Sequence, residues 1–169
     1  KEDVKKIIYS LEKKILSKNV YFNLVVGCAY VELGFPEDAL FFFDRGLFEN
    51  TDDEIKSLFL YNKGLAFSGI GKANDAIQMY QESLNYLNSV YAWESQAKEY
   101  RNKLEALKAK KCIEEAINLA PEKEKERLEE IKQELDLLSS KGLTLSSVKD
   151  KDIRKTLYSA EKLMISDNK

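Results

Sequence analysis

The sequence predicts an all-α protein, and three observations favour that fold class. Apolar residues recur at three- and four-residue intervals along most of the 169 residues, which is the spacing of one face of an α-helix. The chain has 7 glycines and 2 prolines, too few to punctuate a sheet with many tight turns. A skeleton of small and large residues also occurs twice, 37 residues apart, which indicates a repeated structural unit.

Helical spacing and helix-ending residues together define the expected elements. The expected helices cover residues 2–18, 20–33, 36–49, 53–69, 72–88, 90–103, 105–120, 122–140 and 147–166. Gly34 ends the second helix, and Pro36 opens the third in its first turn, where a missing N–H costs nothing. Thr51 and Glu54 are spaced as a capping box for the fourth helix. The remaining breaks fall at Ser89, Ala120-Pro121, Gly142 and Ser146-Ser147.

The two copies of the skeleton align residue by residue. The first copy has Gly27, Tyr30, Gly34, Ala39, Phe43, Gly46 and Leu47. The second copy, 37 residues later, has Gly64, Phe67, Gly71, Ala76, Tyr80, Ser83 and Leu84. A third, degenerate copy fits Trp93, Ala97, Tyr100, Ala109, Ile113, Ala116, Ile117 and Pro121. Small side chains at these positions allow two antiparallel helices to approach closely, and the large ones fill the space between them.

This pattern resembles the tetratricopeptide repeat, a helix–turn–helix unit of about 34 residues. The resemblance implies antiparallel helix hairpins stacked as a right-handed α-solenoid, with added helices at both ends. The implied divisions are an N-terminal packing helix (1–19), repeats within 20–121 (20–51, 53–88 and 90–121), a capping helix (122–142) and a C-terminal amphipathic helix (143–169).

Two parts of this division leave alternatives open. The third repeat has Leu104 where the others have a turn glycine, so residues 90–120 form either two helices, which we favour, or one long helix. Leu128, Ile131, Leu135 and Leu138 make an apolar stripe on the helix expected at 122–140. That stripe favours a helix that caps the last repeat, and a short coiled-coil contact with another chain is the rival interpretation.

The run Phe41-Phe42-Phe43 is expected to belong to the core. Phe43 should face the first helix of its own repeat, and a neighbour such as Phe42 or Phe41 can face the next repeat. Three consecutive residues span most of a helix circumference. One phenylalanine is therefore expected to be exposed or covered by the N-terminal helix.

The sequence argues against an enzyme and against a cofactor or metal site. It contains no histidine, the commonest general base and zinc ligand, and neither Cys28 nor Cys112 has a histidine to activate it. Ser68–Lys72 superficially matches a phosphate-binding loop, but it lacks the full spacing and a preceding strand, so we expect an interhelical turn. The net charge of −2 does not favour nucleic acid as a partner. The sequence contains no run of about twenty apolar residues that would predict a membrane-spanning helix. We therefore expect a cytoplasmic location. A targeting segment removed before Lys1 remains open.

Binding another protein is the function that the resemblance implies. In that family the first helix of each repeat lines a concave groove. The corresponding groove residues here are Tyr21, Leu24, Cys28, Val31, Leu58, Tyr61, Asn62, Leu65, Tyr91, Glu94, Lys98 and Arg101. This mostly apolar lining suits an amphipathic helix or an extended segment with hydrophobic anchors, which implies a scaffold or adaptor. The alternative is a structural subunit that self-associates through its terminal helices, with residues 147–166 filling the groove.

Overall fold

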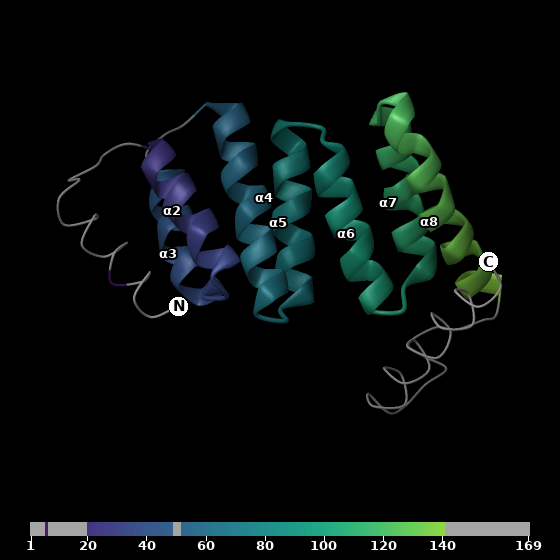
Figure 1. Cartoon of the computed structure of the whole chain (residues 1–169), viewed down its shortest axis with the longest axis horizontal. Helices are drawn as coiled ribbons and strands as arrows, with labels where there is room; N and C mark the ends of the chain where they lie inside the picture. Colours follow the sequence, from purple (N-terminus) through teal and green to yellow (C-terminus); the bar gives the residue numbers. More distant parts are fainter. Residues whose placement is uncertain (1–5, 7–19, 49–51, 141–169) are drawn as a thin grey trace. The chain divides into compact units, whose positions relative to one another are not determined.

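The computed structural model describes residue 6, residues 20–48 and residues 52–140, and within these the fold is all-helical, without a strand (Figure 1). The helices are α2 (Val20–Glu32), α3 (Pro36–Phe48), α4 (Asp53–Gly69), α5 (Ala73–Tyr86), α6 (Val90–Asn102), α7 (Ala106–Leu119) and α8 (Glu122–Ser140). Each agrees with an expected helix to within two residues at either end. The helices expected at 2–18 and 147–166 lie outside the described residues, apart from Lys6.

The chain divides into two compact units between Ser95 and Gln96, a boundary that falls within α6. In the first unit neighbouring helices pack in order, α2 on α3, α3 on α4 and α4 on α5, and α2 also meets α4. In the second unit α7 packs on α8. The first unit therefore contains the antiparallel pairs α2–α3 and α4–α5, and the second unit contains the antiparallel pair α7–α8 (Figure 1).

One contact between a glycine and an aromatic ring recurs in the two hairpins of the first unit. A Cβ atom on Gly27 of α2 would overlap the ring of Phe43 on α3. A Cβ atom on Gly64 of α4 would likewise overlap the ring of Tyr80 on α5. The two contacts are related by the same 37-residue shift as the sequence skeleton. The repeated sequence pattern therefore corresponds to a repeated packing contact.

The phenylalanine run divides between core and surface. Phe43 is fully buried, and its ring meets that of Phe59 on α4 edge to face at 6.3 Å between centroids. Phe42 stacks on Tyr30 of α2 at 5.3 Å, whereas Phe41 is 61% exposed. The ring contact with the next hairpin is the one between Phe43 and Phe59. Phe43 makes it, because Gly46, one turn further along α3, gives the Phe59 ring room to approach.

The three turns within hairpins share one backbone geometry. Gly34 and Gly71 have φ of 81°, and Leu104 takes the same left-handed role with φ of 58°. In each turn the amide after this residue donates to a carbonyl five positions earlier, the longer bond of a Schellman motif. These bonds are Phe35 N–H to Tyr30 O, Lys72 N–H to Phe67 O and Glu105 N–H to Tyr100 O, each 2.9 Å. The prediction of two helices between residues 90 and 120 is confirmed, and the Ser68–Lys72 segment forms the end of α4 and the turn to α5.

The N-terminal cap of α4 differs from the expected capping box. The cap is Asp52, whose Oδ1 accepts a hydrogen bond of 2.8 Å from the backbone N–H of Ile55. Thr51, the expected cap, lies outside the described residues. An aspartate serves this position well because its charge also complements the positive end of the helix dipole.

We expect the substitution Asn23→Leu to raise the free energy of unfolding by about 1–3 kcal/mol. Asn23 on α2 is fully buried, and neither its amide oxygen nor its amide nitrogen has a hydrogen-bond partner among the described residues. The residue 37 positions later is Leu60, also buried, so the repeat accepts leucine there. Chemical denaturation followed by circular dichroism checks the gain. Asn62→Leu is the control, because Asn62 has partners and should gain nothing from the change.

Candidate functional site

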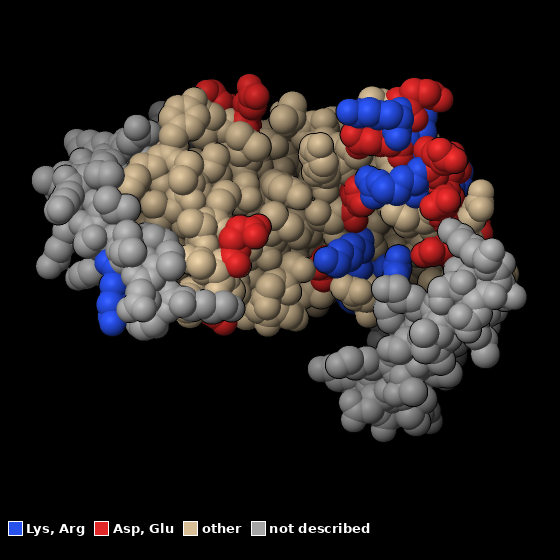
Figure 2. All heavy atoms as spheres, in the orientation of Figure 1, with Lys and Arg blue, Asp and Glu red and all other residues tan. Residues whose placement is uncertain are grey.

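A face with few charged side chains lies over α2 and α4 of the first unit. Figure 2 shows this face as almost entirely uncharged, whereas Lys, Arg, Asp and Glu side chains cover much of the α7–α8 hairpin. The two helices are in direct contact, so residues from both form one surface. We call this surface the α2–α4 face.

Side chains of the expected groove join α2 to α4. The Cys28 thiol donates to Oδ1 of Asn62 at 3.3 Å, and the Asn62 amide donates to the carbonyl of Leu58 at 2.8 Å. The ring of Tyr61 packs near that of the core residue Tyr80, with 5.9 Å between the two ring centroids. The hydroxyl of Ser95 is 3.5 Å from that of Tyr61, so the start of α6 also reaches α4. These contacts hold the centre of the α2–α4 face in one arrangement.

The expected groove residues differ in how far they reach solvent. Tyr21, Leu58 and Tyr91 are exposed, at 59%, 39% and 62%. The half-buried members are Leu24, Cys28, Val31, Tyr61, Asn62, Leu65 and Glu94. Lys98 and Arg101 belong to the second unit, where Arg101 pairs with Glu134 at 3.6 Å. The site that can be described therefore consists of first-unit residues.

Val25 is an exposed apolar residue of α2 that the sequence reasoning missed. It is 66% exposed and lies one turn from Tyr21 and one turn from Cys28, so the three residues share a stripe of the helix. The four-residue spacing between Tyr21 and Val25 could have identified Val25 in the sequence. Val25 was overlooked because the groove positions taken from the tetratricopeptide-repeat resemblance include its neighbour Leu24.

Neither cysteine is an activated nucleophile. Burial, followed by the charge of Glu32, raises the pKa of the Cys28 thiol above its ordinary value. Burial, with a smaller contribution from Glu115, raises the pKa of Cys112 to about 11. Both thiols are therefore protonated at neutral pH, when the thiolate would be the reactive species.

Stability is expected to fall between about pH 9 and pH 11 because of Cys112. Its pKa is higher in the folded state, so its contribution is fully present below the ordinary value near 9 and is lost as the pH rises to about 11. Denaturation midpoints between pH 8 and pH 11 check this. The variant Cys112→Ala should show a shallower decline, and an identical slope would contradict the assignment.

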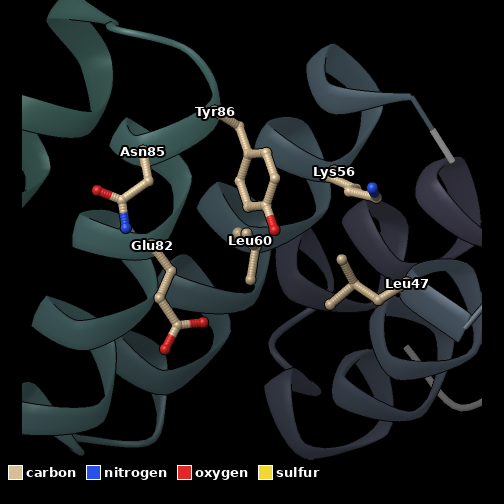
Figure 3. A pocket seen from close by; sticks show the side chains of 6 residues that line it. All are labelled: Leu47, Lys56, Leu60, Glu82, Asn85 and Tyr86. Atoms are coloured by element: carbon tan, nitrogen blue, oxygen red, sulfur yellow. The ribbon is translucent and has the colours of Figure 1, made fainter. Parts of the chain in front are cut away.

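A separate hollow of about 380 Å³ opens among α3, α4 and α5 (Figure 3). It is lined by Leu47, Lys56, Leu60, Glu82, Asn85 and Tyr86. The Lys56 ammonium lies 5.6 Å from the centre of the Tyr86 ring and 3.6 Å from Asp53. None of these residues was expected in a site, because the hollow arises where two hairpins meet and no single repeat defines it. Leu47 and Leu60 supply the apolar part of its lining, and Lys56, Glu82, Asn85 and Tyr86 supply the polar part.

Within the described residues, no three His, Cys, Asp or Glu side chains cluster as a metal site would require. None of the helices in that part of the chain is both long and apolar enough to span a bilayer.

The chain matches no model of a known protein family, and no curated protein sequence gives a match to it.

Proposed function

We propose that this protein is a non-catalytic scaffold or adaptor of the tetratricopeptide-repeat type. In this proposal its hairpins stack as a right-handed α-solenoid, and the α2–α4 face binds a helical or extended segment of another protein. The observation that carries the proposal is the uncharged α2–α4 face, on which Tyr21, Val25 and Leu58 remain exposed.

The energetics of this face favour binding. Exposed apolar side chains that gather on one surface gain about 25 cal/mol for each Å² removed from water. A gathered surface of this kind is typical of interaction sites, whereas single exposed apolar residues are ordinary. The Cys28–Asn62 hydrogen bond and the packing of Tyr61 on Tyr80 fix the surface before a partner arrives. A surface fixed in advance loses less conformational entropy on binding.

The structural subunit remains the alternative function. In that case residues 147–166 of the same chain would cover the α2–α4 face. That segment lies outside the described residues. The two functions differ in what happens when charge is placed on the face, because an open face tolerates charge in the free protein and a covered face does not.

The double variant Val25→Glu with Leu58→Glu tests the proposal. Tagged full-length protein and the variant are purified in parallel from the source cells, and the co-purifying proteins are compared. The matched control is Leu107→Glu on α7, where the leucine is 67% exposed. We expect the double variant to lose proteins that the wild type and the control retain, with its melting temperature unchanged. Retention of the same proteins would contradict the proposal, and a large loss of stability would favour the structural subunit.

A further inference from the structure

The outward side of α3 carries an exposed stripe of alternating acidic and aromatic residues. Glu37, Phe41, Asp44 and Phe48 follow one another at three- and four-residue intervals, so they lie on one side of the helix. All four are exposed, and Phe48 reaches 91%. This side is opposite to the one that buries Ala39, Phe43 and Gly46. We call it the α3 stripe.

The second repeat shows that the fold does not need these residues. The same four positions on α5, 37 residues later, are Asn74, Gln78, Gln81 and Asn85, all uncharged and polar. The two helices occupy equivalent places in their hairpins, because Phe43 and Tyr80 make the same contact with a glycine of the preceding helix. The difference between the stripes is therefore not a packing requirement. Phe41 touches the core ring of Phe42 edge to face at 5.3 Å, yet Phe41 and Phe48 are 61% and 91% exposed, which indicates a binding role.

The charge around the stripe defines what would bind there. The described part of the first unit has ten acidic side chains against five basic ones, Lys6, Arg45, Lys56, Lys63 and Lys72. Two of these basic side chains are held by acids of the same unit, Lys63 by Asp44 at 2.6 Å and Lys56 by Asp53 at 3.6 Å. A partner with positive charge beside its apolar anchors complements this surface, and an anionic membrane does not.

We propose that the α3 stripe is a second docking surface, distinct from the α2–α4 face, and that it binds a basic amphipathic helix of another protein. Apolar side chains on one face of that helix pack against Phe41 and Phe48. Lysine or arginine residues beside them pair with Glu37 and compete with Lys63 for Asp44. The two phenylalanines are separated by two helical turns, about 10 Å, so anchors seven residues apart on the partner match them.

The test replaces residues of the α3 stripe with the residues at the equivalent positions of α5. In the full-length protein, Phe41→Gln with Phe48→Asn removes the aromatic anchors, and Glu37→Asn with Asp44→Gln removes the charges, using the residues that α5 already carries. The probe is a fluorescent peptide of about five helical turns made of leucine and lysine, with leucines at helical spacing. A peptide of the same design with glutamate in place of lysine is its control. Binding is measured by fluorescence anisotropy at low and high salt.

We expect the lysine peptide to bind the wild type. The aromatic double variant should bind this peptide with an affinity lower by about tenfold or more. The charge variant should bind more weakly at low salt and should lose most of its salt dependence. The control variant Leu107→Glu on α7, which changes an exposed leucine outside both docking surfaces, should bind as the wild type does. Equal binding of the lysine peptide by the aromatic variant, or equal binding of the glutamate peptide by the wild type, would overturn the proposal.

Two further outcomes would identify a different occupant. If sedimentation shows that the wild type dimerises and the aromatic variant does not, the stripe binds a second copy of this chain. If the aromatic variant melts at a markedly lower temperature, the chain's own residues cover the stripe. Either result would contradict the binding of a helix from another protein. We expect the aromatic variant to have the same sedimentation mass and melting temperature as the wild type.

Discussion

Alanine in place of Phe43 is expected to lower the free energy of unfolding by about 3–5 kcal/mol. The ring is fully buried, fills the space left by Gly27 on α2 and meets Phe59 on α4. Its removal would leave a cavity at the point where three helices approach, and backbone contacts around a glycine cannot easily close it. Denaturation followed by circular dichroism and by the fluorescence of Trp93 measures the loss.

The control for this change lies two residues away. Phe41→Ala removes the same side chain from a position that is 61% exposed, and it should alter stability by no more than about 0.5 kcal/mol. Equal losses at Phe41 and Phe43 would contradict the division of the phenylalanine run between surface and core.

Valine in place of Gly46 is expected to destabilise the first unit by about 1–3 kcal/mol or more. Even a Cβ atom at this position would overlap the ring of Phe59, which is itself fully buried and has little room to move. The contact joins α3 to α4, so the variant separates the two hairpins of the unit. Thermal and chemical denaturation measure the effect.

Gly71→Asn is the matched control for the glycine substitution. Gly71 has a positive φ that asparagine tolerates, and a Cβ atom there would meet nothing within 4 Å. Its cost should therefore be small. If Gly46→Val were as mild as Gly71→Asn, the close approach of α3 and α4 through Gly46 and Phe59 would be wrong.

Helical spacing of apolar residues, together with helix-ending residues such as Gly34 and Pro36, was enough to predict the helices that the structure describes. The turn at Leu104 could not be predicted from the identity of its residue. Leucine rarely adopts a positive φ, yet the hydrogen bonds of the Schellman motif hold it there. The backbone hydrogen bonds at the end of α6 therefore determine the conformation of this turn more than the intrinsic preference of its residue does.

The candidate sites were only partly predictable. The family positions found Tyr21 and Leu58 on the α2–α4 face but passed over Val25, because they follow the fold and not the exposure of each side chain. The hollow between α3 and α5 has no sequence signal, since its lining comes from three helices. Comparing the repeats with one another would have revealed the α3 stripe, because the spacing of 37 residues pairs Phe48 with Asn85.

Site-specific photocrosslinking tests most directly whether the α2–α4 face binds another protein. A photoreactive phenylalanine derivative is placed at Val25 in the full-length chain, and the same residue at Leu107 serves as the control, since both positions are well exposed. After irradiation in cells, mass spectrometry identifies what is joined to each position. We expect Val25 to crosslink to a defined segment of a different protein and Leu107 to give no such product. Crosslinks from Val25 to residues 141–169 of the same chain, without a second protein, would contradict the account.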